Sequence, residues 1–100
     1  MCIFHCLQNL ILQIIKSATK CSKACSVLIN GYSLLPFLVN VSENIIAGNK
    51  FSIKCLEDIV NNIDNFFKQN KSKESLYQLM LKRIMLNLRP NVINSNLAEK

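Results

Sequence analysis

The sequence predicts an all-α protein of four to five amphipathic helices. Each long apolar stretch spaces its apolar residues three or four positions apart, which is the spacing of one helix face. No stretch shows the sustained alternation of apolar and polar residues that is typical of a half-buried strand. Because 100 residues suffice for one modest core, we expect one domain over residues 1–89 and a frayed tail over residues 90–100.

The first two helices are predicted on either side of a cationic segment. The first covers residues 3–15, and its apolar stripe, which we expect to face the core, consists of Ile3, Leu7, Leu10, Ile11, Ile14 and Ile15. The polar segment KSATKCSK interrupts this stripe. A short second helix from Ala24 to Ile29 should then end at Asn30-Gly31, where glycine can adopt the left-handed conformation of a helix C-cap.

A third helix is predicted directly after this glycine. Ser33 is suited to the N-cap, and Pro36 falls in the first turn, where its missing N–H has no intrahelical partner to lose. The helix should stop near Ala47-Gly48-Asn49, with the second glycine as its C-terminal signal. Its expected inward residues are Leu35, Leu38, Val39, Ile45 and Ile46.

The fourth and fifth helices complete the prediction. Ser52 should cap the fourth, and its apolar stripe comprises Ile53, Leu56, Ile59, Val60, Ile63, Phe66 and Phe67. The stripe of the fifth comprises Leu76, Leu79, Met80, Ile84 and Leu88. Pro90 should end the fifth helix, because it disfavours helical geometry at Arg89.

Two tandem segments carry a resemblance to a known family. LINGYSLLPFLVNVSEN, followed by FSIKCLEDIVNNI, resembles armadillo/HEAT-type helical repeats, in which a short helix ends at a glycine and the next opens near a proline. The matching residues are Leu28, Ile29, Gly31, Pro36, Leu38, Val39, Cys55, Leu56, Ile59, Val60, Asn62 and Ile63. The likeness covers about residues 7–66 and implies a short α-solenoid fragment, a helical-repeat domain within residues 1–89.

The resemblance also implies a function. Helical repeats act as non-enzymatic scaffolds, and each leaves apolar faces for its neighbours. A charged fraction of only 18% agrees with such faces. The arrangement is similar to terminal helical-repeat regions of very large nucleolar proteins associated with pre-ribosomes, which implies ribosome biogenesis as a setting.

A basic C-terminal region is the candidate partner-binding surface. The net charge is +6, and residues 67–89 carry six cations against Glu74. Together with the aromatic end of the fourth helix, the candidate residues are Phe66, Phe67, Lys68, Lys71, Lys73, Lys82, Arg83 and Arg89. We expect an acidic protein partner or neighbouring repeats. Because only Tyr77 is interleaved as an exposed aromatic, any RNA contact should be weak, sequence-blind and salt-sensitive.

No constellation in the sequence predicts catalysis. His5 is the only histidine, no Ser, Cys or Asp has a spacing that suggests a triad with it, and the two glycines cannot form a phosphate-binding loop. We therefore expect no enzyme activity, cofactor, metal or small-molecule substrate. A zinc site of cysteines with His5 is less expected than cysteines packed as small apolar residues.

Two alternatives to the scaffold stay open. Cys2-x3-Cys6 and Cys21-x3-Cys25 are similar to the twin Cys-x3-Cys pattern of small mitochondrial intermembrane-space chaperones, which implies two disulfides across a helical hairpin. Residues 1–15 and 24–42 lack Lys, Arg, Asp and Glu, so a two-span membrane protein is the other alternative. The odd cysteine count and the absence of a secretory signal favour an intracellular location, in the cytoplasm, nucleus or nucleolus.

Overall fold

The structure is a computed structural model that describes residues 3–45, 49–70 and 75–98, with backbone alone over 3–5 and 90–98. Its helices are α1 (Ile3–Ala18), α2 (Ser22–Gly31), α3 (Leu34–Glu43), α4 (Lys50–Gln69) and α5 (Ser75–Ala98). No strand occurs in the described residues, so the all-α prediction is confirmed.

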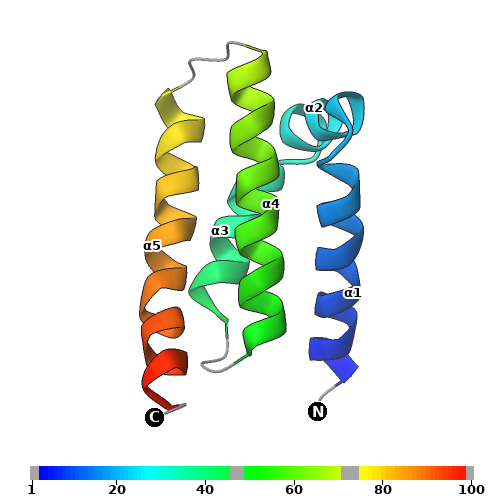
Figure 1. Cartoon of the computed structure of the whole chain (residues 1–100). Helices are drawn as coiled ribbons and strands as arrows, with labels where there is room; N and C mark the ends of the chain where they lie inside the picture. The colour runs from blue at the N-terminus through cyan, green and yellow to red at the C-terminus, as the bar shows by residue number, and fades with distance from the viewer. Residues whose placement is uncertain (1–2, 46–48, 71–74, 99–100) are drawn as a thin grey trace.

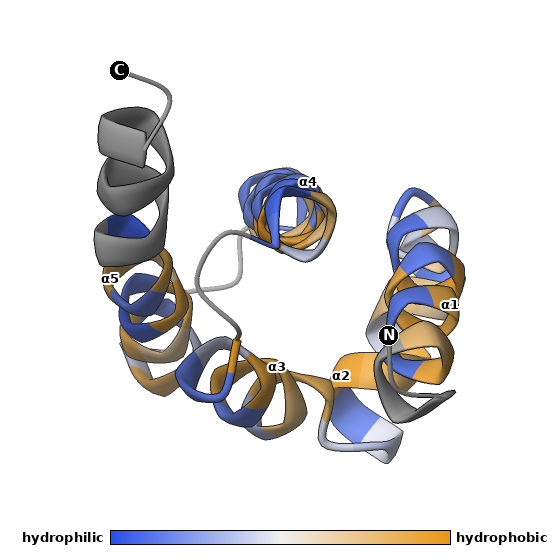
Figure 2. Cartoon of the chain, turned by 90° about the horizontal axis from the view of Figure 1, so that it is seen from below, coloured by the Kyte–Doolittle hydropathy of each residue, from blue (hydrophilic) through white to orange (hydrophobic). Residues whose placement is uncertain are grey.

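The helices are arranged around α4. In Figure 1, α4 lies between α1 and α5, and it runs parallel to α1 and antiparallel to α5. Seen along its axis, α4 is flanked by a crescent formed by α1, α2, α3 and α5 (Figure 2). The closest packing joins α3 with α5 and α4 with both α1 and α5, and α2 contacts α3 and α4.

The predicted apolar stripe of α4 forms the centre of the core. All its members are buried except Phe66, which is partly buried. Cys55 of α4 is buried beside this stripe, and the crescent contributes the other buried apolar residues, which are Leu12, Ile15, Cys25, Ile29, Leu34, Leu35, Leu38, Val41, Leu81, Ile84 and Leu88. The central position of α4 follows from this stripe, because apolar side chains in a helical row stabilise most when neighbours cover the whole row.

The link between α2 and α3 differs from the prediction in one detail. Gly31 is the last residue of α2 and its φ lies outside the left-handed region, whereas Ser33 has a φ of 52° and a ψ of 47°. Ser33 occupies the predicted N-cap position without a capping hydrogen bond from its side chain. The expectation of a left-handed Gly31 is therefore wrong: α2 continues through Gly31, and the 79° bend to α3 is made at the two residues that follow.

The end of α3 also differs. The helix stops at Glu43, several residues before the predicted end near Ala47-Gly48-Asn49, of which Ala47 and Gly48 lie outside the described residues. Asn44 follows as the C-cap, and its side-chain Nδ2 donates to the Asn40 carbonyl at 2.8 Å. An asparagine that satisfies a helix carbonyl through its side chain competes with further helical hydrogen bonds, which accounts for the early stop.

The cap of α4 is Asn49, so the prediction of Ser52 as cap is wrong. Asn49 Oδ1 accepts from the backbone N–H of Ser52 at 3.2 Å. Ser52 is the third residue of the helix, and its own hydroxyl donates to Asn9 of α1 at 2.7 Å. Asparagine is at least as good an N-cap as serine, and this choice leaves the serine hydroxyl available between the helices.

Helix α5 differs from the prediction in two respects. It runs through Pro90 to Ala98, so the predicted end at Pro90 is wrong, while the fraying of residues 90–100 stays a prediction. A proline removes one backbone donor and makes continued helix costly without forbidding it. Leu76 and Leu79 are exposed, contrary to the prediction, whereas Ile84 and Leu88 are buried as predicted. Leu81 is also buried, and Tyr77 and Met80 are partly buried, which completes the inward row.

Candidate interaction surfaces

Polar side chains hold α1 against α4. Besides the bond from Ser52 to Asn9, Asn62 Nδ2 donates to Thr19 Oγ1 at 3.1 Å and to the Lys16 carbonyl at 3.2 Å. The Thr19 hydroxyl in turn donates to the same carbonyl at 3.0 Å. Asn62 therefore satisfies backbone and side-chain groups at the end of α1, which is where a helix leaves carbonyls without partners. These contacts define the α1–α4 seam.

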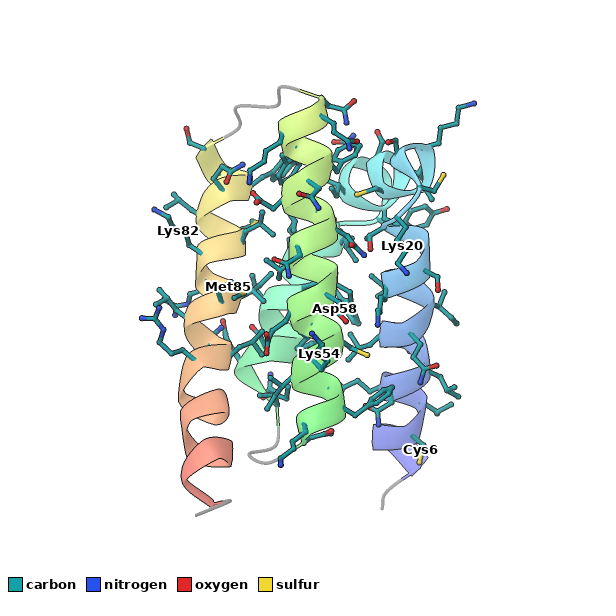
Figure 3. The ribbon with its side chains drawn as sticks, in the orientation of Figure 1. Cys6, Lys20, Lys54, Asp58, Lys82 and Met85 are labelled. Atoms are coloured by element: carbon teal, nitrogen blue, oxygen red, sulfur yellow. The ribbon has the colours of Figure 1, made fainter. Side chains whose placement is uncertain are left out.

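An ion pair lies midway along this seam. Lys16 Nζ of α1 is 3.0 Å from Asp58 Oδ2 of α4, and Lys54 Nζ is 3.3 Å from the other carboxylate oxygen (Figure 3). The hydrogen bond from Lys16 lowers the pKa of Asp58 below its ordinary value of 3.8. The same hydrogen bond raises the pKa of Lys16 above 10.5. Both groups are therefore charged at neutral pH and attract each other.

The seam fixes which face of α1 points outward. Because Asn9, Lys16 and Thr19 turn toward α4, four apolar residues that share another face are exposed: Leu7, Leu10, Ile11 and Ile14. The expectation that these four face the core is wrong, whereas Ile15 is buried as expected. We call them the α1 stripe. Ile14 is 68% exposed, while its neighbour Ile15 is only 8% exposed.

A groove runs between α4 and α5 on the opposite side of α4 from α1. Its volume is about 670 Å³, and its floor is formed by Val60, Leu81 and Leu88. Met85 and Leu86 of α5 add exposed apolar surface beside this floor. The groove thus offers a mainly apolar surface flanked by the outward faces of two helices.

The two lips of the α4–α5 groove carry opposite charges. The α4 lip contains Glu57 and Asp64, and the α5 lip contains Lys82 and Arg89. In the described residues no ion pair joins the lips, since Asp64 pairs with Lys68 of its own helix at 3.1 Å. The two charged residues of each lip are seven positions apart in the sequence, which places them on one face of a helix. The sequence analysis did not predict the acidic lip, although this spacing is visible in the sequence.

The predicted partner-binding residues are only partly brought together. Lys82 and Arg89 line the groove, while Arg83 is exposed elsewhere on α5. Lys68 is exposed and paired with Asp64. Lys71 and Lys73 lie outside the described residues. Two of the predicted cations therefore lie across the groove from acidic residues of α4. The cluster of cations in the sequence does not predict this arrangement.

The aromatic residues at the end of α4 complete the core. Phe67 is buried and stacks on Tyr77 of α5, with ring centroids 5.7 Å apart and planes within 9°. Phe66 contacts Phe67 in a tilted arrangement at 5.7 Å and is partly buried. Phe67, a candidate partner-binding residue, therefore completes the core, and Tyr77 is held against it in place of standing free for base stacking.

The described cysteines lie in two environments. Cys6 and Cys21 are exposed, while Cys25 and Cys55 are buried. Backbone N–H groups of Ala24 and Lys23 lower the pKa of Cys21, whereas burial raises the pKa of Cys25 to about 11. Cys6 lies near the beginning of α1 and Cys21 beyond its other end, so a bridge between them would require a different fold (Figure 3).

The described residues contain neither a cluster of metal-ligating side chains nor a single helix that could span a membrane. No group of three His, Cys, Asp or Glu side chains among them is placed to hold a metal ion. No described helix is by itself long and apolar enough to cross a membrane, although α2 and α3 together meet that criterion as a bent pair by length and composition.

Comparisons with known proteins add no family to this description. No protein-family model, no curated protein and no solved structure matches the chain.

Proposed function

We propose that the chain is a non-enzymatic protein-interaction module, a scaffold of helical-repeat type whose outer helices are covered by protein partners or neighbouring repeats. The observation that carries this proposal is the distribution of exposed apolar residues. Of the twelve exposed large hydrophobic side chains in the described residues, eight lie on α1 and α5, the two helices that flank α4: Leu7, Leu10, Ile11, Ile14, Leu76, Leu79, Met85 and Leu86.

The location of these residues supports a stacked arrangement. Apolar patches that gather on one surface mark interaction sites more often than single exposed residues do. In α-solenoids each unit buries its outer faces against the next unit, so an isolated unit exposes apolar residues at both ends. This pattern fits the armadillo/HEAT-type resemblance and an intracellular assembly of large size, of which the pre-ribosome is the example that the resemblance implies.

Nucleic acid is a secondary partner in this proposal. Lys82 and Arg89 lie across the groove from Glu57 and Asp64, which would repel phosphates. We therefore expect RNA to bind weakly, with an affinity that falls steeply between low and physiological salt. An RNA affinity that stays constant over that range would contradict a phosphate contact.

Affinity capture from the cells of origin tests the function. Four tagged forms are compared: the unmodified chain, Leu10→Ser/Ile14→Ser on α1, Leu79→Ser/Leu86→Ser on α5, and the control Val27→Ser/Tyr32→Ser. The control residues are as exposed as the test residues but lie outside α1 and α5. We expect a defined set of proteins to be lost from the α1 or α5 variant and retained by the control. Identical sets for all four forms, with unchanged helical content, would contradict the proposal.

A further inference from the structure

The α4–α5 groove has the shape of a site for a third helix. Two antiparallel helices form its walls, and Val60, Leu81 and Leu88 form a continuous apolar floor between them. Two helices pack with about 8–10 Å between their axes when the side-chain ridges of one fit into the grooves of the other. Met85 lies at this surface, and methionine adapts its shape to a docked apolar face.

The charges on the two lips determine which charges a docked helix should carry on each of its flanks. Glu57, Lys82 and Arg89 are in no ion pair among the described residues, so their charges are available to a ligand. Asp64 contributes less, because Lys68 already pairs with it. Since α4 and α5 run in opposite directions, Glu57 and Arg89 lie toward one end of the groove, and Asp64 and Lys82 toward the other.

We propose that the α4–α5 groove binds an amphipathic helix of a partner protein, with acidic residues on the flank beside α5 and basic residues on the flank beside α4. Charge complementarity selects this occupant. A nucleic acid would meet the acidic lip, which repels phosphates. A second copy of α1 cannot supply these charges, because Lys16 is its only charged residue and it contains no Asp or Glu.

This occupant is independent of the α1 stripe, which lies on the other side of α4 (Figure 1). The inference goes beyond the general scaffold proposal by naming the chemistry of one partner at one surface. Loss of the groove interaction would leave capture through the α1 stripe intact, so the two proposals fail separately.

Synthetic helical peptides test the inference by fluorescence anisotropy. Three stapled peptides share one apolar stripe and differ in their flanks: one has Glu on one side and Lys on the other, one has Glu on both sides, and one has Lys on both sides. We expect the mixed peptide to bind the unmodified chain about tenfold more tightly than either uniform peptide, from the sum of several partly exposed ion pairs.

Charge reversal of one lip provides the decisive comparison. Lys82→Glu/Arg89→Glu makes both lips acidic, so preference should move to the peptide with Lys on both flanks, again by about tenfold. The control Lys20→Glu/Lys23→Glu changes the net charge by the same amount at exposed residues outside the groove (Figure 3 labels Lys20 and Lys82). It should retain the preference for the mixed peptide. Absence of binding, equal affinity for all peptides, or the same shift in both variants would overturn the inference.

Discussion

The two helices that flank α4 are held by different forces. On one side, α1 is aligned by polar contacts, in which Asn9 meets Ser52, Lys16 meets Asp58 and Thr19 meets Asn62. On the other side, α5 packs on α4 through apolar burial and the stack of Phe67 on Tyr77, and its polar contact is made with α3, where Asn87 Nδ2 donates to Ser42 Oγ at 3.0 Å. Burial is non-directional and supplies stability, whereas paired polar groups tolerate only one rotation of a helix.

This difference explains why the apolar residues of α1 are left outside. Among the described side chains of α1, only Leu12 and Ile15 belong to the buried core, because polar contacts with α4 occupy the remainder of its inner face. The α1 stripe is thus exposed as a consequence of the seam. A surface arranged in this way is available to a partner without any rearrangement of the core.

The largest expected effect lies on the α5 side. Ile84 is fully buried between α5 and its neighbours, so Ile84→Ala should lower the free energy of unfolding by about 3 kcal/mol through lost burial and a cavity. Leu79→Ala on the same helix removes an exposed side chain and should change it by less than about 0.5 kcal/mol. Urea unfolding measures both values, and equal costs would contradict the inward row assigned to α5.

A smaller effect is expected for the polar contact between Asn9 and Ser52. A double-mutant cycle with Asn9→Ala and Ser52→Ala should give a coupling of about 1 kcal/mol, the usual net value of one hydrogen bond. A second cycle pairs Ser52→Ala with Leu10→Ala, whose side chain is exposed, and should give no coupling. Zero coupling in the first cycle would show that this contact does not align α1.

The ion pair of the seam makes stability depend on pH. The pKa of Asp58 is lowered in the folded state, so its contribution is fully present above the ordinary value of 3.8 and is lost as pH falls through the lowered value. The stability difference between the unmodified chain and Asp58→Asn should therefore be constant above about pH 5 and shrink in more acidic solution. Thermal unfolding from pH 7 to pH 2 measures it. A difference that stays the same throughout would exclude this ion pair as the cause.

The smallest expected effect concerns the α1 stripe. Ile14→Ser should change the free energy of unfolding by less than about 0.5 kcal/mol, because the side chain is mostly exposed and the two residues have similar helix propensity. Ile15→Ser, one position along, should cost several times more. Chemical denaturation of both variants distinguishes them, and a large cost for Ile14→Ser would mean that the stripe is covered within the fold.

The sequence was most informative where local pattern and tertiary packing coincide. The buried row of α4 consists of apolar residues at helical spacing, so this spacing alone predicts the buried face. The rotation of α1 was not predictable in this way, because Asn9 and Thr19 meet partners 43 residues away in the sequence. Helical spacing predicts which residues share a face of a helix. It does not predict which of two faces a residue far away in the sequence will contact.

The candidate sites show the same limit. Lys82 and Arg89 were predicted as surface cations, and the structure places both on the α4–α5 groove. These two cations lie across the groove from Glu57 only because α4 and α5 pack side by side in opposite directions. Similarly, Asn49 and Ser52 are both good capping residues, and the structure shows Asn49 as the cap while the Ser52 hydroxyl donates to Asn9 of α1.

Solvent exposure of two adjacent isoleucines tests the orientation of α1 most directly. Methyl NMR with a soluble paramagnetic agent reports how close each methyl group lies to solvent. We expect strong signal loss at Ile14 and protection at Ile15, in line with their exposed fractions of 68% and 8%. Protection of Ile14 together with signal loss at Ile15 would contradict an α1 that turns its polar side to α4 and its apolar stripe outward.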